Sequence, residues 1–301
     1  MKQISILFIL FSLYQSTLGQ THKHDYFSDS KYFDECIIIH YKIKKITVSE
    51  FYSFLENQTI YTFNEKGELI CSESNSFEKD APEIISRQTK DCNEYTNGLQ
   101  TRHLRYRDQK EKPEWIEEFN YEFDKNGNII EIRTIDHTIP RNSNVETFLY
   151  DDENRFIKSI TNSGYITEEY YDADDNLIES SWGSDSLDFN TVKYTYDRWK
   201  NILTMDYSGV VFDNYSLVGT ENQYDKFGRK KSKTLVYASG NKQFETYYYD
   251  NDSIIRVETR FSDSDFKNQT IEIYNSELIQ SITEKSNNKT YLKKTFEYEF
   301  F

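Results

Sequence analysis

The sequence predicts an all-β protein in which repeated β-hairpins form a curled or spiral antiparallel meander sheet. A ten-residue phrase, aromatic-x-aromatic-Asp-x-x-Gly-x-apolar-apolar, recurs along the chain, and its clearest copy runs from Tyr121 to Ile130. Its anchor residues recur at nearly regular steps, and aromatic and polar residues alternate on both sides of its turn. These observations indicate a chain built from one supersecondary unit.

The clearest copy has a direct mechanical interpretation. Tyr121 and Phe123 alternate with Glu122, which is the period of two that a half-buried strand shows. Asp124 to Gly127 has Asp at the first and Gly at the fourth position of a type I turn, and the Gly suits a left-handed residue before a return strand. Each phrase therefore predicts a β-hairpin.

The turn anchors give internal repetition along most of the chain. From residue 124 onward, the anchors at 124, 151, 172, 197, 225, 250 and 275 follow one another at steps of 21 to 28 residues. Each step fits one hairpin with its connection. The residues predicted to build the turns are Asn64, Gly67, Asp124, Gly127, Asp151, Asp172, Asp197, Asp225, Gly228 and Asp250.

Substitutions at the Gly position test the turn prediction. Asn154 and Asp175 stand there in two copies, and these residue types tolerate left-handed backbone best after Gly. Lys200 and Ser253 stand there in two others, where we expect a changed turn type or strain.

The number of hairpins constrains the shape of the sheet. Eight or nine hairpins supply on the order of 16 strands, more than an open twisted sheet usually carries before it curls. The aromatic face, represented by Tyr194, Tyr196, Tyr247 and Tyr249, must be hidden, because burying one such ring contributes roughly 1.5–3 kcal/mol. We therefore expect the sheet to roll up with its aromatic side chains on the concave face.

The segment Tyr224-Asp225-Lys226-Phe227-Gly228-Arg229 resembles the Tyr-Asp-x-x-Gly-Arg core of the YD repeat of Rhs-type proteins. The resemblance runs in degenerate form from about Tyr61 to the end of the chain. It implies an array of YD hairpins, which large members of that family wind into a hollow β-shell, in some cases around a toxin. This chain is short and shows no toxin-like domain after the repeats.

The organisation of the chain follows from its composition. Residues 1–19 read as a secretory signal peptide, with a short basic start, an apolar core and a small-residue cleavage site. Residues 20–301 form one YD-repeat-like domain, with strands expected at 36–41 and 46–54. An irregular excursion is expected at about 71–114, with a short helical piece near 83–88. Cys71 and Cys92 flank that excursion and are candidates for a disulfide, with buried free thiols as the alternative.

Charge and motifs exclude several classes of function. The formal net charge of −15 opposes binding of nucleic acid and electrostatic docking on anionic lipid. Asp172, Asp174 and Asn176 have the first spacings of a calcium loop, but Leu177 stands where that loop needs Gly, so a turn is the better interpretation. His40, His103 and His137 are scattered, and no nucleophile motif accompanies them. The sequence predicts no catalytic residues, metal ligands or cofactor.

The prediction for function is a secreted or periplasmic structural or binding module at the cell envelope, and not an enzyme. Its expected partner is an unknown protein or a surface glycan, with no nucleic acid and no insertion into the membrane after signal cleavage. Trp199 is a candidate for glycan stacking, because its place in a turn directs it outward. The alternatives are a polysaccharide-acting hydrolase that uses carboxylates of the curled sheet, or a component of an Rhs-type toxin locus.

Overall fold

The structure of the protein is a computed structural model that describes residues 35–301, apart from 53–54, 79–80, 109, 185–188, 210–215, 252–253, 263, 276–277 and 288. The expected signal peptide and residue Ser253 lie outside the described residues. Among those described, no helix has the length and apolar character needed to cross a bilayer.

The described chain is a short helix followed by a succession of strands. In chain order the elements are α2 (Glu35–His40), β1 (Ile43–Tyr52), β2 (Leu55–Phe63), β3 (Leu69–Glu78), β4 (Ala81–Thr96), β5 (Leu99–Arg107), β6 (Trp115–Phe123), β7 (Ile129–Asp136), the 3-10 helix η2 (Pro140–Asn142), β8 (Asn144–Tyr150), β9 (Phe156–Thr161), β10 (Ile166–Tyr171), β11 (Leu177–Gly183), β12 (Asn190–Tyr196), β13 (Ile202–Ser208), β14 (Leu217–Tyr224), β15 (Lys230–Tyr237), β16 (Lys242–Asn251), β17 (Ile254–Phe261), β18 (Ser264–Asn275), β19 (Leu278–Ser286) and β20 (Lys289–Phe300).

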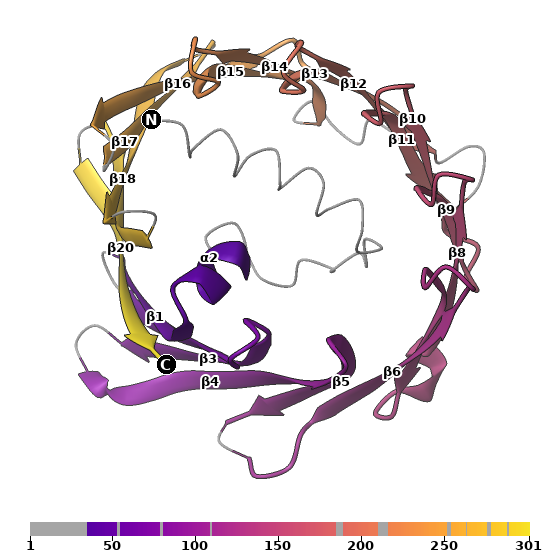
Figure 1. The fold of residues 1–301 in the computed structure, drawn as a ribbon. Coiled ribbons are helices and arrows are strands. Elements are labelled where there is room, and N and C mark those ends of the chain that lie inside the picture. The colour runs from indigo at the N-terminus through magenta and orange to yellow at the C-terminus, as the bar shows by residue number, and fades with distance from the viewer. Residues whose placement is uncertain are drawn as a thin grey trace.

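The strands of the described chain form one closed antiparallel barrel of 20 strands (Figure 1). Each strand pairs with its neighbours in sequence, and β1 also pairs with β20, from Ile43 opposite Phe300 to Tyr52 opposite Leu292. The expected all-β antiparallel meander is present, and it closes into a ring where a curled or spiral sheet was expected. Closure satisfies the two edges that an open meander leaves unpaired.

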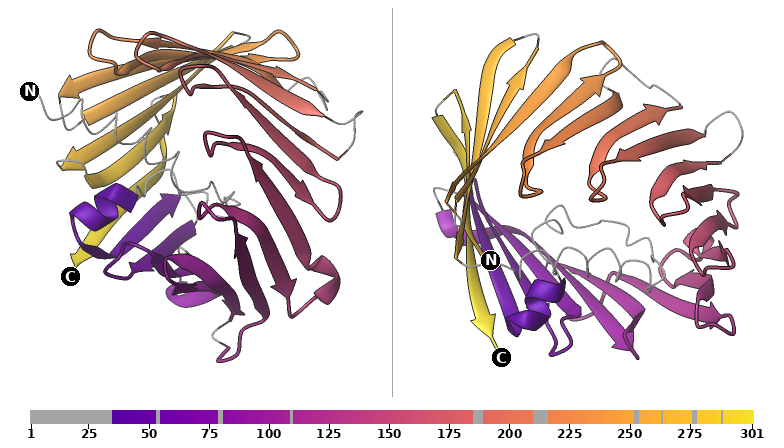
Figure 2. Two further views of the ribbon diagram at one scale, coloured as in Figure 1. Left: turned by 45° about the vertical axis from the view of Figure 1, so that its right-hand side comes forward. Right: turned by 45° about the horizontal axis from the view of Figure 1, so that its top comes forward.

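The antiparallel meander sorts the hairpin turns onto two rims (Figure 2). Each described turn that follows an even-numbered strand lies at one end of the barrel, because strand direction alternates along the ring. The described Asp-anchored turns belong to this set, and we call this end the turn rim. The described connections that follow odd-numbered strands lie at the opposite end.

The aromatic face of the sheet is the interior wall. In Figure 1, α2 lies inside the ring, and its Ile38 is buried in one cluster with Ile46, Val48 and Tyr61. Since side chains alternate across a strand, the face of Tyr61 is the interior face throughout each hairpin. A second buried cluster, of Ile129, Phe148 and Phe156, lies on another arc of the wall. The expectation of aromatic side chains on the concave face agrees with this arrangement.

The outer wall carries charged side chains in cross-strand pairs. Lys158 and Glu168 are joined at 2.8 Å, and Lys193 and Glu179 at 3.2 Å. These residues occupy the strand positions that alternate with the interior aromatics, so they face away from the lumen. Lysine and glutamate side chains thus pair on the outer surface.

Residues 71–114 do not form the expected irregular excursion, because they contribute to β3, β4 and β5 of the wall. The expected helical piece at 83–88 lies within β4. The hairpin of β4 and β5 turns at Asn97 and Gly98, with φ of 53° and 83°. Asn-Gly is a strong signal for a two-residue hairpin turn, and it forms this hairpin in place of the Asp-anchored phrase.

The segment expected as a strand at 36–41 is instead α2 together with the turn that follows it. Ile37 and Ile38 both contribute to the same interior cluster. The run Ile37-Ile38-Ile39 has no period that distinguishes a short buried helix from a strand. Packing of Ile37 and Ile38 in the interior cluster therefore favours the helix over a strand.

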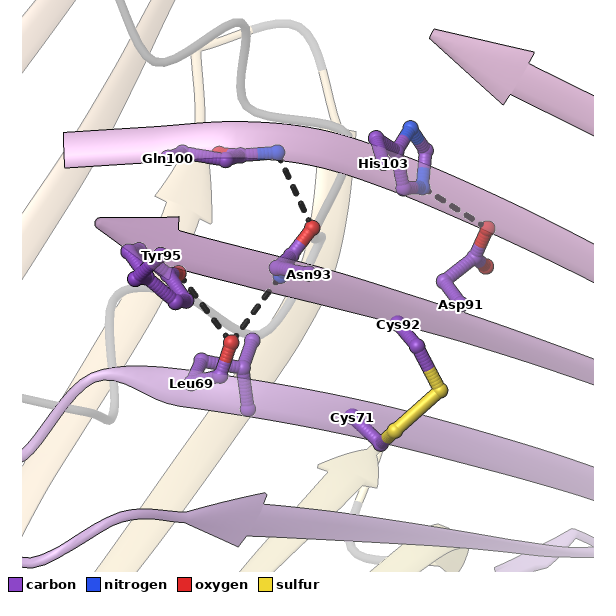
Figure 3. The surroundings of a disulfide bond; sticks show 8 residues. All are labelled: Leu69, Cys71, Asp91, Cys92, Asn93, Tyr95, Gln100 and His103. Atoms are coloured by element: carbon purple, nitrogen blue, oxygen red, sulfur yellow. Dashed lines mark hydrogen bonds and ion pairs between the residues drawn. A yellow bond between two sulfur atoms is a disulfide. The ribbon is translucent and has the colours of Figure 1, made fainter. Parts of the chain in front are cut away.

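Cys71 and Cys92 form a disulfide between β3 and β4 (Figure 3). The two residues are directly opposite in the antiparallel register, with Cα atoms 4.1 Å apart. The pairing that the sequence left open is therefore present, and it links two strands of the wall.

Removing this disulfide should lower the stability of the barrel. The bond closes a segment with a sequence separation of 21 residues, for which loop-closure entropy predicts a loss of about 3 kcal/mol. We expect the double variant Cys71→Ser, Cys92→Ser to unfold at a lower urea concentration than the wild type. The variant Cys36→Ser is the control, and an equal shift in both variants would contradict the prediction.

Candidate functional site

The Asp-anchored turns share one hydrogen-bond pattern that explains their sequence. In the turn at Asp124, Oδ1 accepts the backbone N–H of Asn126 at 2.8 Å and of Asn128 at 2.9 Å. The amide of Gly127 donates to the carbonyl of Asp124, and Gly127 has a φ of 88°. The carboxylate thus satisfies two amides that the turn leaves free, and the left-handed fourth residue forms the bulge before the return strand.

The same pattern recurs in the other described turns of the rim. The anchor's side-chain oxygen accepts the amides two and four residues later at Asn64, Asp124, Asp151, Asp172, Asp197 and Asp225. A left-handed residue stands at the fourth position of each, namely Gly67, Gly127, Asn154, Asp175, Lys200 and Gly228. Lys200, with φ of 65°, keeps the common turn type where a changed turn was an alternative.

Asp250 differs from the other predicted turn anchors. It lies within β16, and its carboxylate approaches Arg256 Nε at 3.6 Å. The tip of that hairpin is outside the described residues. The structure therefore places Asp250 beside its hairpin turn without assigning it the carboxylate-to-amide bonds of the others.

The residue after the left-handed position closes each turn with its side chain. Arg229 Nε donates to Asp225 Oδ2 at 2.8 Å, and Arg155 Nε donates to Asp151 Oδ2 at 2.7 Å. Arg155 thus occupies the place of the consensus Arg of the YD motif, although Asn154 replaces its Gly. In the turns at Asp124, Asp172 and Asp197, an Asn side-chain amide makes the equivalent contact.

These contacts hold the anchors in the ionised form. Burial raises the pKa of Asp197, but hydrogen bonds from Asn201 and from the amide of Trp199 outweigh it and leave the pKa below its usual value. The same balance lowers the pKa of Asp225, where Arg229 supplies the main hydrogen bonds. The anchor carboxylates are therefore occupied by their own turns and offer no free catalytic acid or base.

Neighbouring turns are tied to one another around the rim. Asn126 Nδ2 donates to Asn154 Oδ1 at 2.9 Å, Arg155 Nη1 to Asp175 Oδ1 at 2.8 Å, and Lys200 Nζ to the carbonyl of Asp174 at 2.6 Å. Each bond joins one hairpin to the next. Turn residues at positions three to five thus tie the hairpin tips together.

Tyrosine hydroxyls link adjacent hairpins on the interior wall. Between β11 and β12 the backbone pairing reaches only to Glu179 opposite Lys193, which leaves the carbonyl of Leu177 beyond its end. Tyr196 Oη donates to that carbonyl at 2.6 Å. The same bond is made by Tyr95 to Leu69, Tyr150 to Ile129, Tyr224 to Ile202, Tyr249 to Lys230 and Tyr298 to Ile279.

These links explain why the second aromatic of the phrase is so often Tyr. A Phe at this position would pack on the same wall, but it would leave a strand carbonyl without its donor. Figure 3 shows the arrangement at Leu69, whose carbonyl also accepts Asn93 Nδ2 at 3.0 Å. Burial, with Tyr194 and Asp172 nearby, raises the pKa of Tyr196 to about 12, so its hydroxyl remains a donor.

The interior wall also carries carboxylates beside tyrosines. A Glu two residues before a Tyr accepts its hydroxyl from Tyr171 to Glu169, Tyr247 to Glu245 and Tyr274 to Glu272 at 2.6 to 2.9 Å, and from Tyr52 to Glu50 at 3.5 Å. In each pair the two side chains share the interior face.

A continuous polar network on this wall spans β15 and β16. Tyr237 Oη donates to Gln243 Oε1 at 3.0 Å, Gln243 Nε2 to Glu245 Oε1 at 3.0 Å, and Tyr247 Oη to Glu245 Oε2 at 2.8 Å. Burial and the Glu245 carboxylate raise the pKa of Tyr247. Ring faces, an amide and a carboxylate on one concave wall suit contacts with the CH groups and hydroxyls of a saccharide.

A histidine cluster on the same wall was not foreseen from the sequence. His103 Nε2 lies 3.1 Å from Asp91 Oδ1 and Nδ1 lies 3.3 Å from Glu117 Oε2, which joins β4, β5 and β6. Arg105 Nε donates to Asp91 at 2.7 Å. Burial lowers the pKa of His103, but the two carboxylates outweigh it and raise the pKa to about 9. Both ring nitrogens then donate, and the cation bridges three strands.

The former excursion contributes one hollow on the outer surface. Its volume is about 430 Å³, and it is lined by Glu73, Gln88, Lys90, Tyr106, Asp108, Lys110 and Glu111. By strand alternation, Glu73, Lys90 and Tyr106 face away from the lumen. This hollow lies on the strands that replace the irregular excursion expected at 71–114.

The comparisons with known proteins concern strand architecture. No protein-family model and no curated protein sequence matches the chain. A crystal structure of TcdB2-TccC3-Cdc42 aligns at 13% identity with a TM-score of 0.29, over 77% of this chain and 16% of that one. The Photorhabdus luminescens Tc holotoxin pore aligns at 13% identity and 0.29, over 78% and 16%. A porin-like protein from Bacteroides uniformis aligns at 11% identity and 0.38, over 85% and 98%.

Tyr196→Phe should destabilise the barrel without changing its fold. The variant leaves the carbonyl of Leu177 without its hydroxyl donor, and a lost hydrogen bond of this kind costs about 1 kcal/mol. Urea unfolding followed by far-UV circular dichroism measures the change. Tyr170→Phe is the matched control, because Tyr170 is half exposed on the outer face. Equal effects of the two variants would contradict the role of the interior hydroxyl.

Deprotonation of His103 should lower the stability of the barrel at alkaline pH. Its folded pKa of about 9 exceeds the ordinary value of 6.5, so its contribution is complete below 6.5 and is lost as the pH rises to about 9. The slope should be at most roughly 1.4 kcal/mol per pH unit. In His103→Gln this loss should be absent. His137→Gln is the control, since His137 is half exposed and its ring lies beside Glu118. An unchanged pH profile in His103→Gln would refute the assignment.

Proposed function

We propose that this protein is an exported binding module of the cell envelope that takes a glycan chain against the interior wall of its barrel. The observation that carries the proposal is the set of tyrosine–carboxylate pairs on the interior wall. Tyr171 and Tyr247 face the lumen beside Glu169 and Glu245, while the pairs Lys158–Glu168 and Lys193–Glu179 lie on the outer wall. A barrel of 20 strands encloses more space than its own side chains fill, since barrels of about 16 strands already leave an aqueous channel.

The charges on the outer wall support the proposal that the barrel does not span a bilayer. A membrane barrel presents an apolar band to lipid, with charged substitutions there costing about 2–4 kcal/mol at the midplane. Here Lys158, Glu168, Glu179 and Lys193 occupy the outer face of consecutive strands. A bound ligand is therefore expected in the lumen, while the outer wall remains in water.

Several features support a binding module over an enzyme. The anchor carboxylates are bonded within their turns, and Glu169, Glu245 and Glu272 each accept a tyrosine hydroxyl. Arg155 closes its turn as Arg229 does, so a second turn of this chain matches the Arg position of the YD repeat. That resemblance supports a shell built to enclose a ligand, and membership of an Rhs-type toxin locus is the family-based alternative.

Glycan binding should depend on the inner face of β16 and not on its outer face. Using mature protein from Gln20 onward, we expect Tyr247→Ala and Glu245→Gln to weaken binding to envelope polysaccharide about tenfold, because ring stacking and a carboxylate acceptor are lost. Tyr248→Ala is the matched control, as the adjacent residue faces outward and contacts Glu258 and Arg256.

The measurement is isothermal titration calorimetry against a panel of soluble envelope polysaccharides. Equal losses in Tyr247→Ala and Tyr248→Ala would remove the lumen from the proposal. A steady release of reducing ends during the titration would favour the hydrolase alternative. Capture of one stoichiometric protein from the envelope, with no glycan bound, would assign a protein partner instead.

A further inference from the structure

We propose that the turn rim carries a docking patch for an anionic lipid surface, formed by the adjacent tips of the β12–β13 and β14–β15 hairpins. The patch consists of Arg198, Trp199, Lys200, Lys226, Phe227 and Arg229. It is separate from the interior wall and does not depend on the proposed glycan binding.

The two aromatic rings project into solvent. Trp199 is 67% exposed and Phe227 is 70% exposed, the two highest values among the exposed large apolar side chains of the described chain. Each ring stands at the third position of an Asp-anchored turn. The turn is held by the backbone amide of that residue, which donates to Asp197 or Asp225 at 2.8 Å. The side chains themselves therefore have no part in holding the turns.

The two tips are neighbours on the rim. β13 pairs with β14, and Tyr224 Oη and Asn222 Nδ2 both donate to the carbonyl of Ile202 near the tips. Equivalent positions of adjacent hairpins are two strand spacings apart, or about 10 Å. One flat surface can therefore contact both rings at once.

Basic groups flank both rings. Arg198 lies over the Trp199 ring at 3.7 Å from its centroid, and Lys226 and Arg229 lie 4.9 and 5.3 Å from the Phe227 centroid. With Lys200, the two tips carry four basic side chains against the carboxylates of Asp197 and Asp225, which are bonded within their turns. The patch is thus locally positive on a protein with a formal net charge of −15.

This combination fits a lipid surface better than a polymer. Phe227 has no polar group with which to bind a saccharide hydroxyl, and hairpin tips are convex, so they cannot enclose a chain. Exposed apolar rings with adjacent Lys and Arg are the chemistry of interfacial docking, in which rings enter the headgroup region and cations contact anionic lipids. The aliphatic stems of the Lys and Arg side chains can extend so that their charged ends reach the headgroups while the rings insert.

The acidic arc of the same rim limits the orientation. Asp152, Glu153 and Asp174 stand at the tips of the β8–β9 and β10–β11 hairpins and are repelled by an anionic surface. Those charges are screened over about 8 Å at physiological ionic strength. The barrel should therefore dock with its rim tilted toward β12–β15, and binding should weaken as salt increases.

The test is co-sedimentation of the mature protein with vesicles of phosphatidylcholine containing 30 mol% phosphatidylserine, beside vesicles of phosphatidylcholine alone. We expect binding to the anionic vesicles and at least tenfold weaker binding to the neutral ones. The double variant Trp199→Ser, Phe227→Ser and the double variant Arg198→Gln, Lys226→Gln should each reduce the partition coefficient about tenfold. Unchanged far-UV circular dichroism and urea midpoint establish that the variants fold.

The matched control is Leu149→Ser, Tyr170→Ser, which removes two half-exposed apolar side chains from outside the patch. It should bind anionic vesicles like the wild type. Equal binding of all variants, equal binding to both vesicle types, or no binding would each overturn the proposal. So would retention on immobilised polygalacturonate that depends on Trp199 and Phe227 while vesicles are ignored, because the partner would then be an anionic polysaccharide.

Discussion

The barrel depends on a hydrogen bond that the backbone itself does not make. Between adjacent hairpins, strand pairing ends short of the turn rim, as at Glu179 opposite Lys193, and a tyrosine hydroxyl binds the carbonyl that is left over. This contact lets neighbouring hairpins separate toward their tips and still satisfy their backbone groups. A ring of 20 strands needs such freedom at each junction, because curvature and twist accumulate around it.

Local chemistry made the hairpins predictable from the sequence. Asp at the first position and a left-handed residue at the fourth specify the turn, and alternation then assigns each aromatic to one face. Even Lys200 follows this rule, which shows that the carboxylate bonds of Asp197 outweigh the preference of a Lys for other backbone conformations. Features that depend only on the residues within one hairpin could therefore be predicted from the sequence.

Contacts between distant residues were beyond the same reasoning. Closure joins Ile43 to Phe300, and no local pattern encodes that pairing. The helix α2 exists because Ile38 reaches the interior cluster, and the His103 site forms because β4, β5 and β6 bring Asp91 and Glu117 to one ring. The wall at 71–114 was missed for a different reason, since Asn97-Gly98 replaces the Asp-anchored turn and hides the repeat.

The repeat leaves two positions of each turn free to vary, and this determines where surface function can arise on the rim. The anchor, the left-handed residue and the residue after it are bound to one another, whereas positions two and three contribute to their own turn through the backbone, and the Asn126 side chain at position three contacts the next hairpin. Those positions read Lys-Asn at 125–126, Asp-Glu at 152–153, Ala-Asp at 173–174, Arg-Trp at 198–199 and Lys-Phe at 226–227. Substitution there changes the charge and apolarity of the rim without altering the turns. The formal net charge of the whole chain does not reveal this pattern, because acidic and basic arcs lie side by side on the rim.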